Sequence, residues 1–105
     1  MAKAAPLSPN PATAGQTLVC QADGVAVVPT SLIGWSAAES TGSAAASFRL
    51  HDGTSAAAPE LTAAIKLVAG ESDRDWFGDQ TVEVFSGSIF VEIISGSVEL
   101  VTYWG

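Results

Sequence analysis

The residues best suited to chemistry lie in a short acidic segment. Three aspartates, Asp73, Asp75 and Asp79, follow Glu71 within nine residues. Carboxylates at alternating positions can converge on a hard cation such as calcium. A calcium loop of the EF-hand type beginning at Asp73 would need a glutamate at its twelfth position, where this chain has Val84. The segment is therefore a weak calcium candidate, and the pattern favours a solvent-exposed turn between strands.

The sequence holds one cysteine, Cys20, and one histidine, His51. A single cysteine cannot form a disulfide within the chain, and no zinc ligand cluster is available. A nucleophilic cysteine needs a histidine partner, and no motif places His51 beside Cys20. We therefore interpret Cys20, in the run QTLVCQA, as a small buried residue of a strand. The common catalytic and nucleotide-binding motifs do not occur, so we expect no enzyme activity, no catalytic residue and no cofactor.

The chain has three tryptophans, Trp35, Trp76 and Trp104. Trp35 lies within an apolar run and is predicted to be in the core. Trp76 and Trp104 suit either the core or an interface, and exposed aromatic rings on a sheet could also stack on sugars. The candidate partner interface lies in the N-terminal segment and beside these two tryptophans: Pro6, Leu7, Pro9, Pro11, Trp76, Phe77, Tyr103 and Trp104.

Charge limits the possible partners. Eleven acidic residues against four basic ones give a net charge of -7, so the chain repels phosphate backbones, and we expect no nucleic-acid binding. No stretch approaches the roughly 18 apolar residues that cross a membrane, and residues 1–15 lack the apolar run of a secretory signal. We therefore expect synthesis in the cytoplasm and no membrane association.

Composition indicates a partner chain. Hydrophobic residues make up 48% of the sequence and charged residues only 14%. A single small domain of 105 residues buries about two thirds of its unfolded surface, which leaves apolar side chains on the outside. We expect a homo-oligomer or a larger assembly.

The candidate functional residues must be positioned by β-strands. Short runs of β-branched and aromatic residues alternate with glycines, and successive glycines in the series Gly70, Gly78, Gly87 and Gly96 are eight or nine residues apart. This pattern predicts an all-β fold, a single antiparallel β-sandwich of about eight short strands, with jelly-roll connections as one option. The runs SIFVEIIS and SVELVTYW meet at Ser95-Gly96, which predicts a β-hairpin between them.

Two segments are less regular. Residues 1–15 contain three prolines and no hydrophobic period, so we predict an extended or disordered N-terminal arm ahead of a sandwich domain over residues 16–105. The run LTAAIKLV at 61–68 fits both helical and strand spacing, and its short length favours a strand. Further strands are expected at 17–20, 25–28, 32–39, 45–50, 74–77 and 81–85.

Four segments carry a resemblance: LIGWSAAESTG, SAAASFRLHDG, IKLVAGESDRDWFGD and SGSIFVEIISGSVELVTYW. Together they resemble small β-sandwich virion proteins of tailed phages that infect actinobacteria. The resemblance implies a capsid decoration, or cement, protein that binds the major capsid protein on the outer capsid surface, stabilises the shell and forms a trimer. The alternative within the same resemblance is a receptor- or glycan-binding virion module, such as a head fibre or tail-tip domain. The N-terminal arm has no counterpart in the family pattern.

Overall fold

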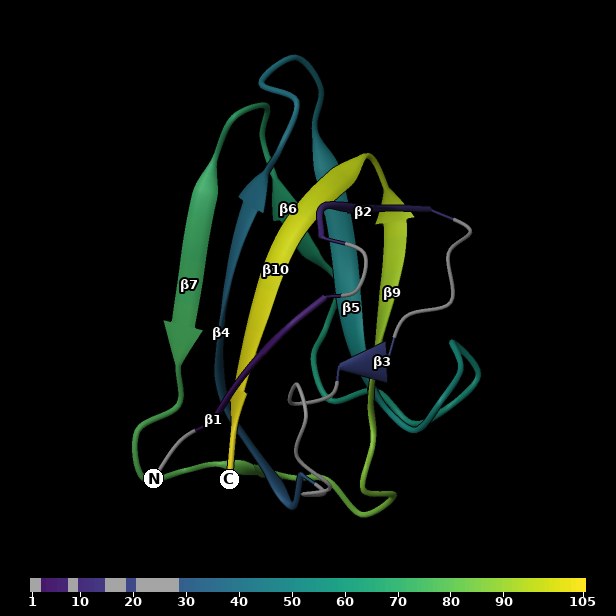
Figure 1. Cartoon of the computed structure of the whole chain (residues 1–105), viewed down its shortest axis with the longest axis vertical. Coiled ribbons are helices and arrows are strands. Elements are labelled where there is room, and N and C mark those ends of the chain that lie inside the picture. Colours follow the sequence, from purple (N-terminus) through teal and green to yellow (C-terminus); the bar gives the residue numbers. More distant parts are fainter. Residues whose placement is uncertain (1–2, 8–9, 15–18, 21–28) are drawn as a thin grey trace.

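The structure, a computed structural model, describes residues 3–7, 10–14, 19–20 and 29–105. These residues form ten strands and no helix, which confirms the all-β prediction. Two antiparallel sheets pack face to face as a β-sandwich (Figure 1). No helix long and apolar enough to cross a membrane occurs in the described part of the chain.

The larger sheet has six strands, with the order β1-β10-β4-β7, while β2 also pairs with β10 and β8 with β4. Its strands are β1 (Lys3–Pro6), β2 (Ala12–Thr13), β4 (Ser31–Glu39), β7 (Ser72–Trp76), β8 (Val82–Glu83) and β10 (Ser97–Trp104). The smaller sheet has the order β3-β9-β5-β6. Its strands are β3 (Val19–Cys20), β5 (Ala46–Asp52), β6 (Ile65–Leu67) and β9 (Ile89–Ser95).

Most predicted strands are present with small shifts at their ends. The segment at 61–68 is a strand only over Ile65–Leu67, because Leu61 and Thr62 instead bond to the backbone of Leu50. Cys20 lies in a strand as expected, although the structure does not describe its side chain. The strand predicted at 25–28 lies outside the described residues.

The predicted hairpin between β9 and β10 is wrong. β9 pairs with β3 and β5, whereas β10 pairs with β1, β2 and β4 in the other sheet. The chain crosses between the sheets at Gly96, which has a φ of 76°. A Cβ atom there would lie 2.6 Å from the carbonyl oxygen of Ala45, so the crossing needs glycine. The inward residues of the two strands therefore face each other across the core.

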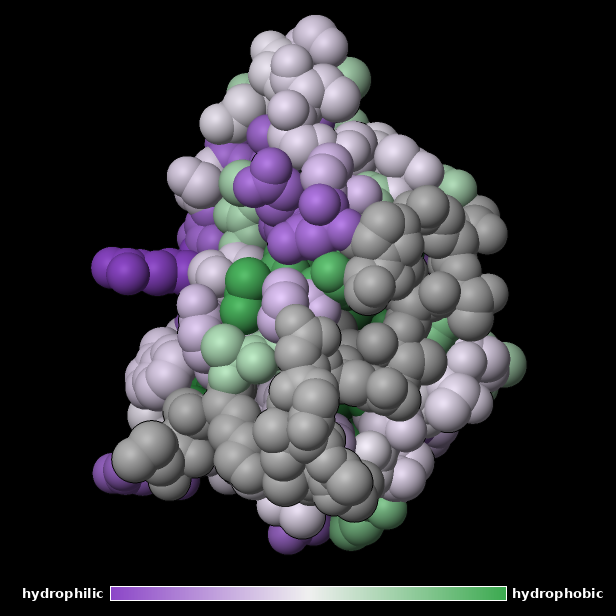
Figure 2. All heavy atoms as spheres, viewed as in Figure 1, coloured by the Kyte–Doolittle hydropathy of each residue, from purple (hydrophilic) through white to green (hydrophobic). Residues whose placement is uncertain are grey.

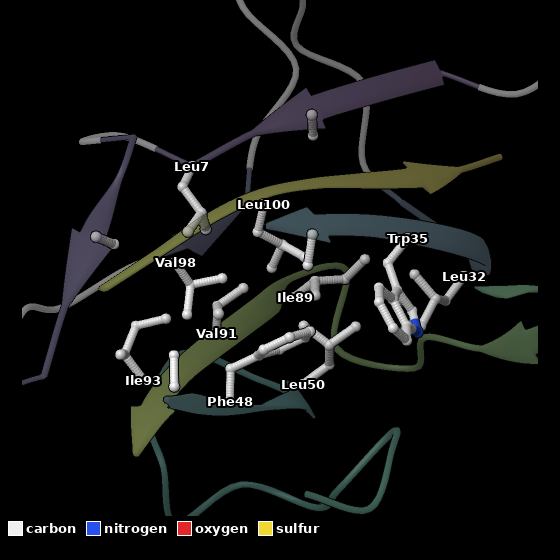
Figure 3. Close-up of a cluster of buried hydrophobic side chains, with 14 of the residues drawn as sticks. Leu7, Leu32, Trp35, Phe48, Leu50, Ile89, Val91, Ile93, Val98 and Leu100 are labelled. Carbon is white, nitrogen blue, oxygen red and sulfur yellow. The ribbon is translucent and has the colours of Figure 1, made fainter. Parts of the chain in front are cut away.

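The core lies between the sheets, as Figure 3 shows. Val91 and Ile93 of β9 project from one sheet, and Val98 and Leu100 of β10 project from the other. Trp35 of β4 is 4% exposed, as predicted for a core residue. Its ring meets that of Phe48 edge to face, with centroids 5.4 Å apart, which joins the two sheets. Full burial of each large apolar side chain stabilises the fold by about 1.5 to 3 kcal/mol.

The described part of the N-terminal segment is extended, as predicted, but it belongs to the sandwich. β1 pairs with β10 from Lys3↔Trp104 to Pro6↔Val101. The Leu7 amide donates to the carbonyl oxygen of Leu100 at 3.1 Å, and the Leu7 side chain points into the core (Figure 3). Proline fits at the end of this edge strand, where a missing N–H breaks no ladder bond. These residues are therefore a strand of the larger sheet rather than a separate arm.

One buried carboxylate holds two turns together. Glu39, at the end of β4, accepts hydrogen bonds from the amides of Thr41, Gly42 and Gly70 at 2.6 to 3.0 Å. The Thr41 hydroxyl also donates to it at 2.7 Å. The hydrogen bond from the Thr41 amide is the largest influence, and with the other donors it outweighs burial and lowers the pKa of Glu39 to about 2. The charged side chain thus links the turn after β4 to the turn before β7.

The crossing at Gly96 can be tested against a matched glycine. Gly42 also has a positive φ, of 74°, but a Cβ atom there would meet nothing within 4 Å. Gly42→Ala should destabilise the fold by about 1 kcal/mol, the penalty of the left-handed conformation. Gly96→Ala should cost about 2 kcal/mol more, because the added methyl group meets backbone. Urea unfolding measures the free energy of unfolding of both variants. An equal loss of stability in the two would show that the backbone is not tightly packed at Gly96.

The Glu39 network predicts acid sensitivity. Because the pKa in the folded state is about 2, against an ordinary value of 4.5, this stabilisation is complete above about pH 4.5 and is lost as the pH falls toward 2. Thermal unfolding from pH 6 to pH 2 should show this loss. Glu39→Gln keeps an acceptor without the charge, so its melting temperature should be lower at pH 6 and fall less in acid. A variant with the same acid slope as the parent protein would contradict this role.

Candidate functional site

The structure separates the predicted interface residues into exposed and buried groups. Trp76 is 59% exposed, while Phe77 and Tyr103 are half-buried. Trp104 is 0% exposed and Leu7 is 4% exposed, so both lie in the core. For Trp104 this is one of the two predicted alternatives, whereas Leu7 was expected only at an interface. Trp104 follows the inward alternation of β10, and Leu7 enters the core beside that strand. Pro6 is half-buried and Pro11 is exposed, and Pro9 lies outside the described residues.

Two residues of this set, Trp76 and Tyr103, belong to the outer face of the larger sheet, whereas Phe77 packs against the core. Figure 2 shows hydrophobic residues over β10 near the middle of one face, with hydrophilic residues above them. The register of β10, β4 and β7 places outward residues side by side in three rows. The rows are Tyr103, Gly34 and Trp76; then Val101, Ser36 and Arg74; then Glu99, Ala38 and Ser72.

The first row is an aromatic pair that spans a glycine. The rings of Trp76 and Tyr103 lie with centroids 5.6 Å apart and planes inclined by 57°. Gly34 between them has no side chain, and a Cβ atom there would lie 2.9 Å from Cε3 of the Trp76 ring. The Tyr103 hydroxyl and the Ser36 hydroxyl are 3.2 Å apart and share a hydrogen bond. The missing side chain at Gly34 thus lets the two rings meet.

The rows form a groove along β4, which we call the β4 groove. Small residues of β4 form its floor, and side chains of β7 and β10 form its walls, all of them larger than the floor residues except Ser72. Two adjoining hollows share Ser36 and Arg74, and one of them ends at Trp76 and Tyr103. Asn10 lies at the other end, where its Oδ1 accepts a hydrogen bond from the Leu100 amide at 3.1 Å. The groove therefore has an aromatic end and a polar end.

The calcium candidates have a different role. Asp73 and Asp75 pair with Ala37 and Trp35, so they stand on the opposite face from the groove, on an exposed strand at the sheet edge. Asp73 accepts a hydrogen bond from the Arg74 amide at 2.8 Å. Charged residues on an edge strand that face the core side hinder pairing with another chain. Within the described ranges, no three His, Cys, Asp or Glu side chains, Asp79 included, are grouped to hold a metal ion.

A second exposed aromatic residue lies in the connection between β7 and β9. Phe85 is 85% exposed, although the sequence places it in a predicted strand at 81–85, of which only Val82–Glu83 forms. Val84 is buried, so the exposed Phe85 is out of phase with the apolar positions of its own segment. The position of Phe85 out of step with Val82 and Val84 is the signal in the sequence that could have identified it as an exposed residue.

Phe85 is presented on a braced backbone. Asp52 accepts hydrogen bonds from the amides of Phe85 and Ser86, both at 2.9 Å. Burial raises the pKa of Asp52, but the hydrogen bonds from Ser86 and Phe85 outweigh burial and lower it. The Val84 amide donates to Thr30, and the amide of Gly53 donates to Ser88. Hydrogen bonds thus hold the backbone on both sides of Phe85, and we call this segment, residues 84–88, the tip.

The single histidine is structural in its contacts. His51 is 1% exposed, and its Nδ1 lies 2.9 Å from the carbonyl oxygen of Ala58. Its Nε2 lies 2.9 Å from Oε1 of Glu92 on β9. A carbonyl oxygen only accepts, so Nδ1 carries a proton. His51 therefore holds the 53–60 loop against the smaller sheet.

Comparison with known proteins adds no relative. No family model, no curated protein and no solved structure matches this chain.

The brace at Asp52 is tested by amide exchange. Asp52→Ala removes the acceptor for two amides, so exchange of the Phe85 and Ser86 amides with water should become about tenfold faster or more. NMR exchange measurements give both rates. Asp79→Ala, in an exposed position of the same connection, serves as the control and should leave them unchanged. Unchanged rates in Asp52→Ala would mean that the tip is held by other contacts.

Proposed function

We propose that this chain is a structural protein of a phage virion, a capsid decoration protein that binds the major capsid protein on the outer surface and stabilises the shell. The proposal starts from the resemblance to small virion proteins of actinobacterial phages. The four segments that carry the resemblance form β4, β5, the β6–β7 region and the β9–β10 crossing, which are the framework of the sandwich. The remaining support comes from the exposed aromatic residues.

The observation that carries the proposal is a pair of exposed aromatic residues on one braced connection. Trp76 ends β7 and Phe85 follows β8, and the connection between β7 and β9 runs along one end of the molecule (Figure 1). Tyr103 supports the Trp76 ring, and Asp52 fixes the backbone of Phe85. Aromatic side chains are enriched among the residues that dominate binding, and ordering them in advance lowers the entropy lost on contact.

The size of this end sets the scale of one contact. The molecule measures 36 × 27 × 26 Å, so an end perpendicular to its long axis covers about 700 Å². That is close to the roughly 800 Å² that each partner buries in an interface of standard size. One copy can therefore form about one contact of standard size, and a homotrimer at a three-fold position would bind through several such ends together. The net charge of -7 fits a basic partner surface.

The docking end is tested with two exposed apolar positions. Phe85→Ser removes an aromatic anchor and should weaken binding to capsids that lack the protein by about tenfold or more. Val68→Ser is the matched control, because Val68 is 66% exposed just before the start of β7, at the other end of that strand. Co-sedimentation with purified capsids measures both affinities. Equal binding by the two variants would remove Phe85 from the interface.

Imaging decides the location. Cryo-electron microscopy of capsids incubated with the parent protein should show regular density at three-fold or quasi-three-fold positions. Density at the tail alone, or on no part of the particle, would contradict a decoration role.

A further inference from the structure

We propose that the β4 groove binds a neutral oligosaccharide of about two to three sugar units. This site is additional to capsid docking and lies on the face of the larger sheet; it shares Trp76 with the docking end but does not include Phe85. Its walls and floor come from three strands whose register is defined, so its residues have fixed neighbours. The inference rests on the groove's aromatic end, on its balance of charge and on its length.

The aromatic end suits a sugar ring. Trp76 is 59% exposed, and Tyr103 meets it at an inclination of 57°, so the two rings form an open corner. The C–H groups on one face of a pyranose ring are apolar and pack against an aromatic face. The Tyr103 hydroxyl is bonded to Ser36 on the groove floor, which orients the ring before a ligand arrives. Such a corner offers the C–H face of a sugar ring an aromatic surface that is already in place.

The charges facing the groove balance. Arg74 on the β7 wall and Glu99 on the β10 wall are both exposed, and they supply one positive and one negative group. Asp73 and Asp75 also line the two hollows, but the alternation of β7 directs their side chains to the opposite face of the sheet. A ligand that both donates and accepts hydrogen bonds and carries no net charge fits this set. Sugar hydroxyls have that chemistry.

The length of the groove limits the ligand. Successive rows are two residues apart along each strand, so three rows span about 14 Å. The floor of the groove is Gly34, Ser36 and Ala38, so no large side chain interrupts it along its length. A di- or trisaccharide lying along β4 would reach from Trp76 to Glu99.

A protein segment fits the groove less well. The centre of a protein interface is usually apolar, whereas two of the three rows here carry a charged wall residue over a small floor residue. Strand addition at the neighbouring edge is also hindered. The Phe77 amide donates to Ile33 of β4, so the amides of odd-numbered residues along β7 face β4 and the Arg74 amide faces the sheet edge. There the Asp73 carboxylate accepts the hydrogen bond of the Arg74 amide, which leaves that amide unavailable to an added strand. The observations therefore favour a sugar over a peptide.

An array of neutral and acidic glycans tests the proposal. The protein, biotinylated at its N-terminus, is displayed on fluorescent streptavidin so that four copies compensate for the weak affinity expected of one shallow site. The parent protein should bind neutral glycans. Trp76→Ala should lose at least about tenfold of that signal, and Arg74→Met provides a second variant should Trp76→Ala fold poorly. Phe85→Ser should bind glycans as the parent does, even if it no longer binds capsids.

NMR then locates the ligand. Titration of the isotope-labelled protein with the best neutral trisaccharide should shift the amides of Ser36, Arg74 and Val101 in a saturable way. Four results would overturn the proposal: no neutral glycan bound, signal unchanged in both groove variants, amide shifts confined to other strands, or groove shifts caused by the major capsid protein and by no sugar. Because capsid binding depends on Phe85 and sugar binding does not, failure of one function is distinguishable from failure of the other.

Discussion

The backbone crossing at Gly96 is the constraint on which the rest of the molecule depends. It takes the chain from the middle of the smaller sheet to the middle of the larger one in a single residue. The crossing requires a left-handed φ and close approach to the backbone of Ala45, both of which glycine permits. Because β10 then lies between β1 and β4, Tyr103 is placed beside Gly34 and Trp76. The outer face exists in its present form because of that placement.

The same crossing explains what sequence patterns could predict and what they could not. Alternation identified the inward positions of β9 and β10, since residues such as Val91 and Leu100 are buried in a hairpin and in a crossing alike. It could not distinguish the two arrangements, because the difference lies in which strands exchange hydrogen bonds. The alternation also places Trp104 among the inward residues of β10, whereas its aromatic character alone left core and interface both open.

The candidate site was only partly predictable. Trp76 and Tyr103 were among the predicted interface residues, but their contact depends on the register between strands far apart in the sequence. Asn10 gave no signal, because its bond to the Leu100 amide arises only when the N-terminal segment lies along β10. The acidic residues of β7 suggested a cation, and the fold uses Asp73 to occupy an edge amide instead. The edge strand β7 thus resists association with another strand, whereas the outer face of the larger sheet offers a surface for binding.

Both proposed functions require β10 to lie in the larger sheet beside β4. Nuclear Overhauser contacts in solution measure this arrangement directly. We predict contacts between the ring protons of Trp76 and Tyr103 and between the backbones of Leu100 and Ala37, which are register partners. Backbone contacts that continue along β9 and β10 away from Gly96, as in a hairpin, would contradict the account.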